Sequence, residues 1–104
     1  MRIRKDLMTN EDFQLIARAS DALAHPARVA IFHFIYQKNL NREDVCNKDL
    51  VEAFEYSQST ISQHVSKLVC GGLITVKQDG PKNLYYVNLG ELGQYLNAVK
   101  KLNA

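Results

Sequence analysis

The segment from Ser57 to Cys70 has the most distinctive chemistry in this 104-residue chain. It contains no aspartate or glutamate, and Ile61, Val65 and Leu68 recur at the spacing of one helix face. The opposite face then carries Gln58, Ser59, Ser62, Gln63, Ser66 and Lys67. Glutamine and serine can bond base edges, and a helix without acids is not repelled by phosphate. The segment therefore predicts a helix that lies in the major groove of DNA.

A simpler interpretation is that this polar face is only solvated. Exposed helix faces usually carry glutamate, lysine and alanine, because serine and threonine are weaker helix formers. The use of weak formers here favours DNA recognition over a merely solvated helix. The residues that we expect to contact DNA from this helix are Ser57, Gln58, Ser59, Thr60, Ser62, Gln63, His64 and Lys67. Among them, Gln58 and Lys67 are expected to bind phosphates, and Ser57 to cap the helix.

A β-hairpin is predicted after the helix ends at Gly71-Gly72. Residues 73–76 are strand formers, and Asp79-Gly80-Pro81 favours a turn before a second strand over residues 84–89. The polar groups expected to reach phosphates beside the groove are Lys77, Lys82 and Asn83. Asp79 opposes this interpretation, because phosphate repels its carboxylate.

The rest of the chain predicts four more helices around this unit. Thr9 can cap a helix over residues 10–23, and a second, apolar nearly all round and so central, begins at Pro26. A loop over residues 38–44 precedes a short helix that contains Leu50, Val51 and Phe54, with Asn47 as its candidate cap. The last helix spans residues 91–102.

These elements predict a mainly α fold with a β-hairpin wing. The fold class is a winged helix-turn-helix of five helices and a two-stranded wing, in which the second helix of the pair reads DNA. We expect one domain over residues 1–104, preceded at residues 1–8 by a basic arm.

Three motifs resemble the ArsR/SmtB-type regulators. Residues 57–68 look like that family's recognition helix: Ser-Gln, two variable residues, an apolar residue, then Ser-x-His-apolar-x-x-Leu. Residues 21–28 are similar to its Leu-Ala-x-Pro-x-Arg segment, and residues 71–74 with 84–86 resemble its helix end and wing. The resemblance implies a homodimeric transcriptional repressor on a palindromic operator in double-stranded DNA. Glu55 departs from the family, whose turn often carries glycine there.

Apolar stripes near both chain ends predict the dimer interface. The stripes consist of Phe13 and Ile16 in the first helix and Leu92, Tyr95, Leu96 and Val99 in the last. They could instead cover the core of a single chain. A two-fold partner, however, would place two recognition helices one DNA turn apart.

The family's metal sites are not preserved in this sequence, and we expect no metal or other cofactor. The arsenic-type motif Cys-x-Cys-Asp-Leu is Cys46-Asn47-Lys48-Asp49-Leu50 here, with lysine at the second cysteine. The zinc-type site uses Asp, His and Glu in the last helix, where residues 91–104 hold only Glu91. The histidines at 25, 33 and 64 do not cluster in sequence. A redox pair of Cys46 and Cys70 remains an alternative.

Composition argues against several other classes of protein. We find no nucleophile–base pair, phosphate-cradling glycine loop or supported carboxylate pair, so we do not expect an enzyme. Two cysteines and the lack of a membrane-length apolar run favour a cytoplasmic domain. A net charge of +2 means that DNA contacts must come from local charge placement. A winged helix that binds only protein is the competing function, and it would favour an acidic or apolar recognition face.

Overall fold

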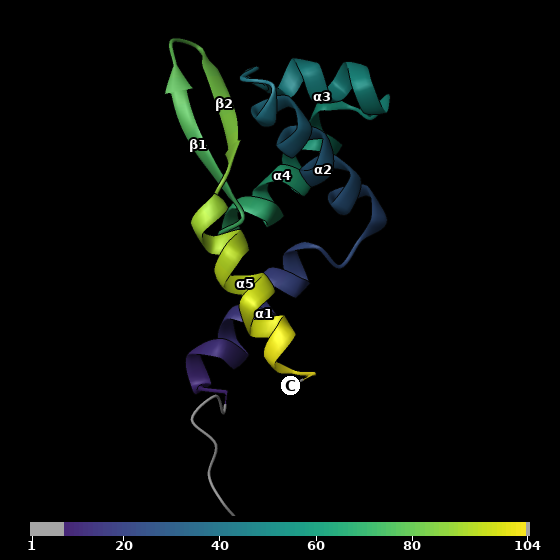
Figure 1. Cartoon of the computed structure of the whole chain (residues 1–104). Helices are drawn as coiled ribbons and strands as arrows, with labels where there is room; N and C mark the ends of the chain where they lie inside the picture. The colour runs from purple at the N-terminus through teal and green to yellow at the C-terminus, as the bar shows by residue number, and fades with distance from the viewer. Residues whose placement is uncertain (1–7, 104) are drawn as a thin grey trace, which may run out of the picture.

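The computed structural model describes residues 8–103, and it contains five helices and a two-stranded antiparallel hairpin (Figure 1). The elements are α1 (Asn10–Ala22), α2 (Pro26–Leu40), α3 (Asn47–Phe54), α4 (Gln58–Cys70), β1 (Ile74–Asp79), β2 (Lys82–Val87) and α5 (Leu89–Lys101). This arrangement confirms the predicted fold class. Most of the basic arm expected at residues 1–8 lies outside the described residues.

Local capping explains where most of the helices begin. The Thr9 hydroxyl accepts from the Asp12 N–H at 3.2 Å, and the Asp12 carboxylate accepts from the Thr9 N–H at 2.9 Å. Ser57 accepts from the Thr60 N–H at 3.2 Å at the start of α4. His25 caps α2 through Nδ1, which accepts from a backbone N–H two residues later. The predicted starts of α1, α2 and α4 are thereby confirmed.

Several boundary predictions are wrong: both strands reach closer to the turn than predicted, over Ile74–Asp79 and Lys82–Val87, and α5 begins at Leu89 rather than 91. In three further cases a tertiary contact or a cap outweighs local sequence. Helix α2 continues to Leu40, through part of the predicted loop, and the Asn39 side chain accepts from the Val87 N–H of β2 at 2.9 Å. Helix α3 is capped at Cys46 rather than Asn47, since the Cys46 N–H donates to the Asp49 carboxylate at 2.9 Å. The second strand ends at Val87, and the residues that follow enter α5.

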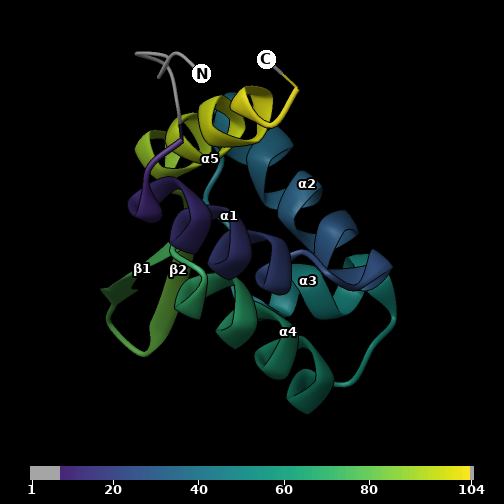
Figure 2. The same cartoon turned by 90° about the horizontal axis from the view of Figure 1, so that it is seen from below.

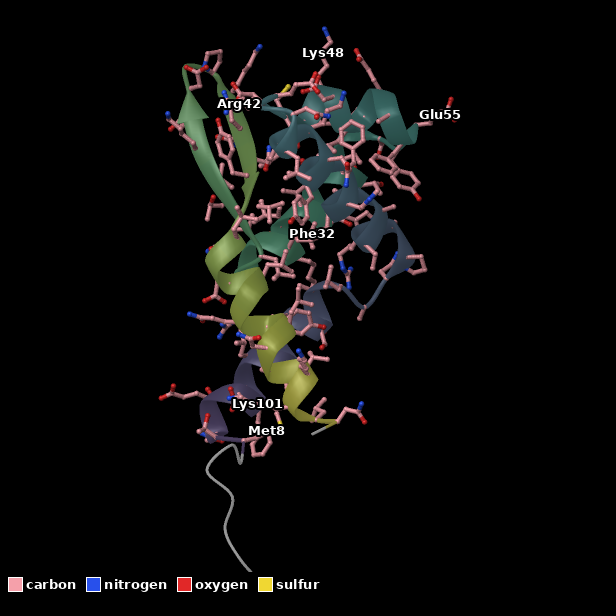
Figure 3. The ribbon with its side chains drawn as sticks, viewed as in Figure 1. Met8, Phe32, Arg42, Lys48, Glu55 and Lys101 are labelled. Atoms are coloured by element: carbon pink, nitrogen blue, oxygen red, sulfur yellow. The ribbon has the colours of Figure 1, made fainter. Side chains whose placement is uncertain are left out.

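The core lies between α2, α3, α4 and the base of the hairpin. Its fully buried side chains include Ile31, Ile35, Leu50, Ile61 and Leu68. Phe32 of α2 lies in the middle of the molecule (Figure 3). Helix α2 is central, as predicted, but it is not covered all round.

Helices α1 and α5 pack side by side, at the end of the molecule away from the hairpin tip (Figures 1 and 2). Arg18 pairs with Glu91 at 3.2 Å, and Lys101 pairs with Asp12 at 3.1 Å. The Ser20 and Tyr95 hydroxyls are also hydrogen-bonded, at 3.0 Å. None of the helices within residues 8–103 is both long and apolar enough to cross a membrane.

Candidate nucleic-acid interface

Helix α4 presents the polar face that the sequence predicts. Its side chains Ile61, Val65 and Leu68 are buried against the core, and the opposite side faces solvent. The exposed side chains there are Gln58, Ser59, Ser62, Gln63, Ser66 and Lys67. With no acid between Ser57 and Cys70, this face can approach phosphates without charge repulsion.

The turn between α3 and α4 places Glu55 in a left-handed conformation. Its φ of 56° and ψ of 28° lie in the region that glycine adopts without steric cost. The Glu55 N–H donates to the Val51 carbonyl at 3.0 Å and closes the end of α3. The backbone at this position therefore needs the left-handed conformation that glycine adopts most easily, and this chain places a glutamate there instead.

Three predicted DNA contacts at the start of α4 already have hydrogen-bond partners, namely Ser57, Ser59 and Thr60. The Ser57 hydroxyl accepts from the Thr60 N–H and donates to the Thr60 hydroxyl at 2.9 Å. Thr60 is only partly exposed, whereas Ser59 is exposed and its hydroxyl lies 3.3 Å from the Ser57 hydroxyl. Ser57 and Thr60 thus build the helix start, and Ser59 begins the exposed face that continues with Ser62 and Gln63.

His64 lies apart from the open face of α4. Its ring is 5.1 Å from the His25 ring and 6.1 Å from the Tyr56 ring, measured between centroids. Burial, followed by the charges of His25 and Arg28, lowers the pKa of His64 below its ordinary value. The imidazole therefore stays neutral near pH 7 and packs against the start of α2.

A cavity of about 670 Å³ runs along the α1 and α2 side of α4. Its lining includes Arg18 and Arg28, together with Gln63, His64 and Lys67 of α4. The Arg28 guanidinium donates to the Ala22 carbonyl at 2.7 Å and to the Asp21 carbonyl at 3.2 Å. Sequence reasoning did not assign Arg18 or Arg28 to the site, and only their place in the fold reveals that they flank α4.

The wing, defined as β1 and β2, ends in the two-residue turn Gly80-Pro81. Gly80 has a φ of +60°, and proline holds its own φ near −65°, which together favour a type II′ turn. The residues expected to contact phosphate, Lys77, Lys82 and Asn83, are all exposed in the distal half of this hairpin. Asp79 pairs with Lys82 across the strands, so opposite charges lie side by side there.

A second cavity, of about 270 Å³, lies between the wing and the starts of α3 and α4. It brings together Lys48 of α3, Gln58 of α4 and the wing residues Lys82 and Asn83. Figure 3 shows Lys48 projecting from α3 at the same end of the molecule as the wing tip. Sequence analysis treated Lys48 only as a replacement for a cysteine. Its place at the first helix of the pair was the signal that could have marked it as a phosphate contact.

Cys46 stands where the arsenic-type motif begins, and its neighbours differ from that motif. Lys48 stands two residues later, and an ammonium group cannot act as a ligand. Within residues 8–103, no three His, Cys, Asp or Glu side chains gather in a metal-binding group. Cys46 and Cys70 are both free thiols, half-buried and exposed respectively.

Comparison with known proteins agrees with this geometry. The sequence pattern of the bacterial regulatory protein arsR family matches residues 25–76, half of the chain, from the start of α2 into β1. The chain belongs to the arsR family. This is a family of regulatory proteins rather than of enzymes.

Two curated relatives support the assignment to the arsR family. The chain is 38% identical over 63 residues to the arsenical resistance operon repressor of Staphylococcus aureus. This match covers 58% of the present chain and 61% of the relative. It is 35% identical over 75 residues to the repressor of the same description in Staphylococcus xylosus, covering 72% and 66%. The matches thus span less than two thirds of these relatives' own lengths.

Solved structures of arsR-like proteins share the fold. An ArsR-like transcriptional regulator from Rhodococcus sp. RHA1 superposes with a TM-score of 0.75 at 19% identity, covering 89% of this chain and 83% of that one. A homodimeric winged helix-turn-helix DNA-binding domain from Mycobacterium bovis has a TM-score of 0.70 at 20% identity, covering 98% and 88%. At these identities the likeness shows the winged helix-turn-helix fold.

Proposed function

We propose that this protein is a sequence-specific, DNA-binding transcriptional repressor that acts as a homodimer on a palindromic operator. The observation that carries the proposal is the exposed, acid-free face of α4 with cationic side chains on both flanks. Lys48 and Lys82 lie on the wing side. Arg18, Arg28 and Lys67 lie on the other, where Asp21 also lines the cavity and Arg18 pairs with Glu91. A helix of this kind can enter the major groove while its flanks bind the two adjacent phosphate backbones.

Within this proposal the contacts divide by chemistry. Ser59, Ser62 and Gln63 are the base-reading residues, because they are exposed and can both donate and accept. Phosphates are bound by the residues predicted from the sequence, Gln58, Lys67, Lys77, Lys82 and Asn83, and by the flanking Lys48, Arg18 and Arg28. Ser57, Thr60 and His64 act at the margins of the interface, through the capping and packing contacts described above.

The proposed dimer interface is the apolar side of the α1–α5 pair. Phe13 and Leu96 are 54% and 56% exposed, which is unusual for side chains of this size. Ile16 and Val99 lie near them on their helices and are half-buried. Leu92 and Tyr95, by contrast, pack against the core of their own chain, so these two contribute only their exposed edges. The other side of the pair is a polar groove lined by residues such as Gln14, Gln94 and Asn97. A second copy that packs on the apolar side would cover Phe13 and Leu96, which a monomer leaves in water.

We further propose that this regulator lacks the metal responses of its family, because Lys48 replaces a thiolate and α5 carries a single acid, Glu91. Neither arsenite nor Zn²⁺ should then release it from DNA. Release by either ion, in protein whose thiols are reduced, would contradict this part of the proposal.

The decisive experiment is selection of duplexes from a randomised pool, followed by anisotropy measurements on the selected duplex, a scrambled duplex and a salt series. We expect a palindromic sequence bound by two protomers, with affinity that falls steeply as salt rises. Failure to enrich any sequence would contradict sequence-specific recognition and favour a winged helix that binds protein.

Two α4 substitutions separate base reading from phosphate binding. Gln63→Ala should relax preference at one operator position, costing about 1–3 kcal/mol there. Lys67→Ala should weaken binding to all duplexes and reduce the salt slope by about one. Gln14→Ala, in the polar groove of α1, is the matched control and should change neither. A uniform loss of affinity for Gln63→Ala would contradict its role as a base reader.

A further inference from the structure

A hydrogen-bonded chain of three side chains connects the wing to α4 through the first residue of α3. The Tyr85 hydroxyl of β2 donates to the Asn47 Oδ1 at 2.6 Å. The Asn47 Nδ2 in turn donates to the Ser62 Oγ at 3.0 Å. Asn47 is therefore not the cap that its residue type suggests, and its amide bridges two proposed DNA-binding elements.

The wing end of this chain is held rigidly. Tyr85 is 6% exposed, and its backbone N–H donates to the Val45 carbonyl at 2.8 Å. Burial, followed by the neighbouring Cys46, raises the pKa of the Tyr85 phenol, so the hydroxyl keeps its proton. The neighbouring Tyr86 hydroxyl donates to Asp44 at 3.0 Å, which further ties β2 to the segment before α3.

The two distances agree with one orientation of the Asn47 amide. A separation of 2.6 Å is typical of an O–H···O bond, and 3.0 Å is typical of an N–H···O bond. Tyr85 therefore faces the amide oxygen, and Ser62 faces the amide nitrogen. An amide nitrogen can only donate, so the Ser62 oxygen must accept from it. Among residues 8–103, the Ser62 proton has no acceptor of its own.

We infer that Asn47 is a positioning residue that makes the Ser62 hydroxyl a hydrogen-bond donor toward DNA. This inference rests on the proposed function. A donor in the major groove pairs with an acceptor such as purine N7, guanine O6 or thymine O4. The Ser62 oxygen keeps one lone pair that an amino group could reach, but Asn47 occupies the other and leaves the proton directed to DNA. Ser62 then favours acceptors over amino groups at one operator position, and Asn47 and Tyr85 set that preference without touching DNA.

Asn47→Asp tests the inference, because it should reverse the base preference at the operator position that Ser62 contacts. The carboxylate still accepts from Tyr85 but also accepts from Ser62, which turns the Ser62 proton inward and its lone pairs toward the groove. The preference at the Ser62 position should shift from acceptor to amino-bearing bases by about 5–10-fold, the effect of one hydrogen bond. The added charge should also lower affinity for every duplex equally. These two effects separate when the ratio of affinities is measured on operators substituted at each position.

A double-substitution cycle tests whether Asn47 acts through Ser62. Asn47→Ala should reduce discrimination at the Ser62 position, and the same change in a Ser62→Ala background should have no further effect there. Tyr85→Phe should give a smaller loss at the same position. Asn97→Ala, an exposed asparagine of α5, is the matched control and should leave the base preferences unchanged.

The outcomes distinguish this inference from the proposed function. If the unsubstituted protein selects no sequence, the proposed function itself is wrong. If it selects one but Asn47→Asp leaves the Ser62 position unchanged, or Asn47→Ala acts equally in the Ser62→Ala background, the positioning role is overturned. Should the alanine variant fail to fold, which thermal unfolding would show, the Asn47→Asp and Tyr85→Phe profiles decide.

Discussion

Glu55 is held in a backbone conformation that its side chain disfavours. A left-handed non-glycine residue costs about 1 kcal/mol or more, because its Cβ crowds the neighbouring carbonyl. The turn needs this conformation, since it reverses the chain between α3 and α4 within three residues. The strain therefore lies in the link that sets the angle of the recognition helix.

Glu55→Gly should stabilise the protein by about 0.5–1 kcal/mol, the relief of strain less the entropy that glycine loses. Urea denaturation at one fixed protein concentration measures the effect. The control is Ala53→Gly two residues earlier, at a helical and exposed position of α3. That control should destabilise by about 1 kcal/mol. A lower urea midpoint for Glu55→Gly would show that the glutamate is not strained.

His64 should make stability depend on pH. Its pKa is lowered in the folded state by burial and by His25 and Arg28, so below the ordinary value of 6.5 the unfolded chain takes up the proton first. The contribution of neutral His64 to the free energy of unfolding should therefore be complete above pH 6.5, and it should be lost as the pH falls toward the folded-state pKa.

NMR titration of the His64 ring and denaturation at about pH 5.5 and about pH 7.5 measure this dependence. His64→Gln should flatten the loss of stability on acidification. His33→Gln, at an exposed position of α2, should retain it and serves as the control. An unchanged slope for His64→Gln would assign the pH dependence to other groups.

The contact between α1 and α4 depends on the absence of a side chain at Gly71. A Cβ built there would lie 2.4 Å from the Cβ of Ala22 and 3.3 Å from the Arg18 carbonyl. Such distances require one helix to shift, because the first partner is a buried methyl group and the second is backbone. Gly71 thus brings the end of α4 close to the end of α1.

Gly71→Ala should destabilise the fold by about 1–3 kcal/mol through overpacking. Gly93→Ala is the matched control, because a Cβ at this position in α5 meets no atom within 4 Å. It should stabilise the helix by about 0.5–1 kcal/mol. Thermal unfolding of both variants at equal concentration measures the difference. Equal behaviour of the two variants would show that the α1–α4 contact can relax without cost.

The whole molecule is arranged so that the tip of the wing and the far ends of α1 and α5 lie at opposite ends (Figure 1). Helix α1 contacts both α5 and α4, so it connects the two ends through the close packing at Gly71. A dimer formed by α1 and α5 would in this way fix the spacing of two α4 helices. That spacing must match about one turn of DNA for a palindromic operator.

Leu96→Glu should convert the dimer into a monomer, because it places a charge in the centre of the proposed apolar contact. Light scattering after size-exclusion chromatography at micromolar concentration measures the mass. Gln94→Glu adds the same charge on the polar side of α5 and should remain dimeric. Loss of the dimer should also lower operator affinity. A monomeric mass for the unsubstituted protein would contradict the dimer altogether.

Much of the site could be predicted because its determinants are local. The buried stripe of α4 follows from the helical period, and its start follows from Ser57 acting three residues ahead. The wing turn follows from Gly80, which supplies a positive φ, and Pro81, which cannot. Even the strained turn could be anticipated, because Glu55 stands where relatives of this family often carry glycine.

Only the tertiary structure decided what the polar side chains of these elements do. Asn47 would cap a helix on local grounds, yet it bonds to Ser62, 15 residues away, and to Tyr85, 38 residues away. His64 belongs to the recognition helix in sequence but packs on His25. Local patterns are set by residues within about four positions of each other, whereas these contacts depend on the angles at which α2, α3 and β2 cross α4. The sequence by itself therefore determined which helix carries the polar, acid-free face proposed to bind DNA, and the packing of distant elements determined which of its side chains stay free on that face.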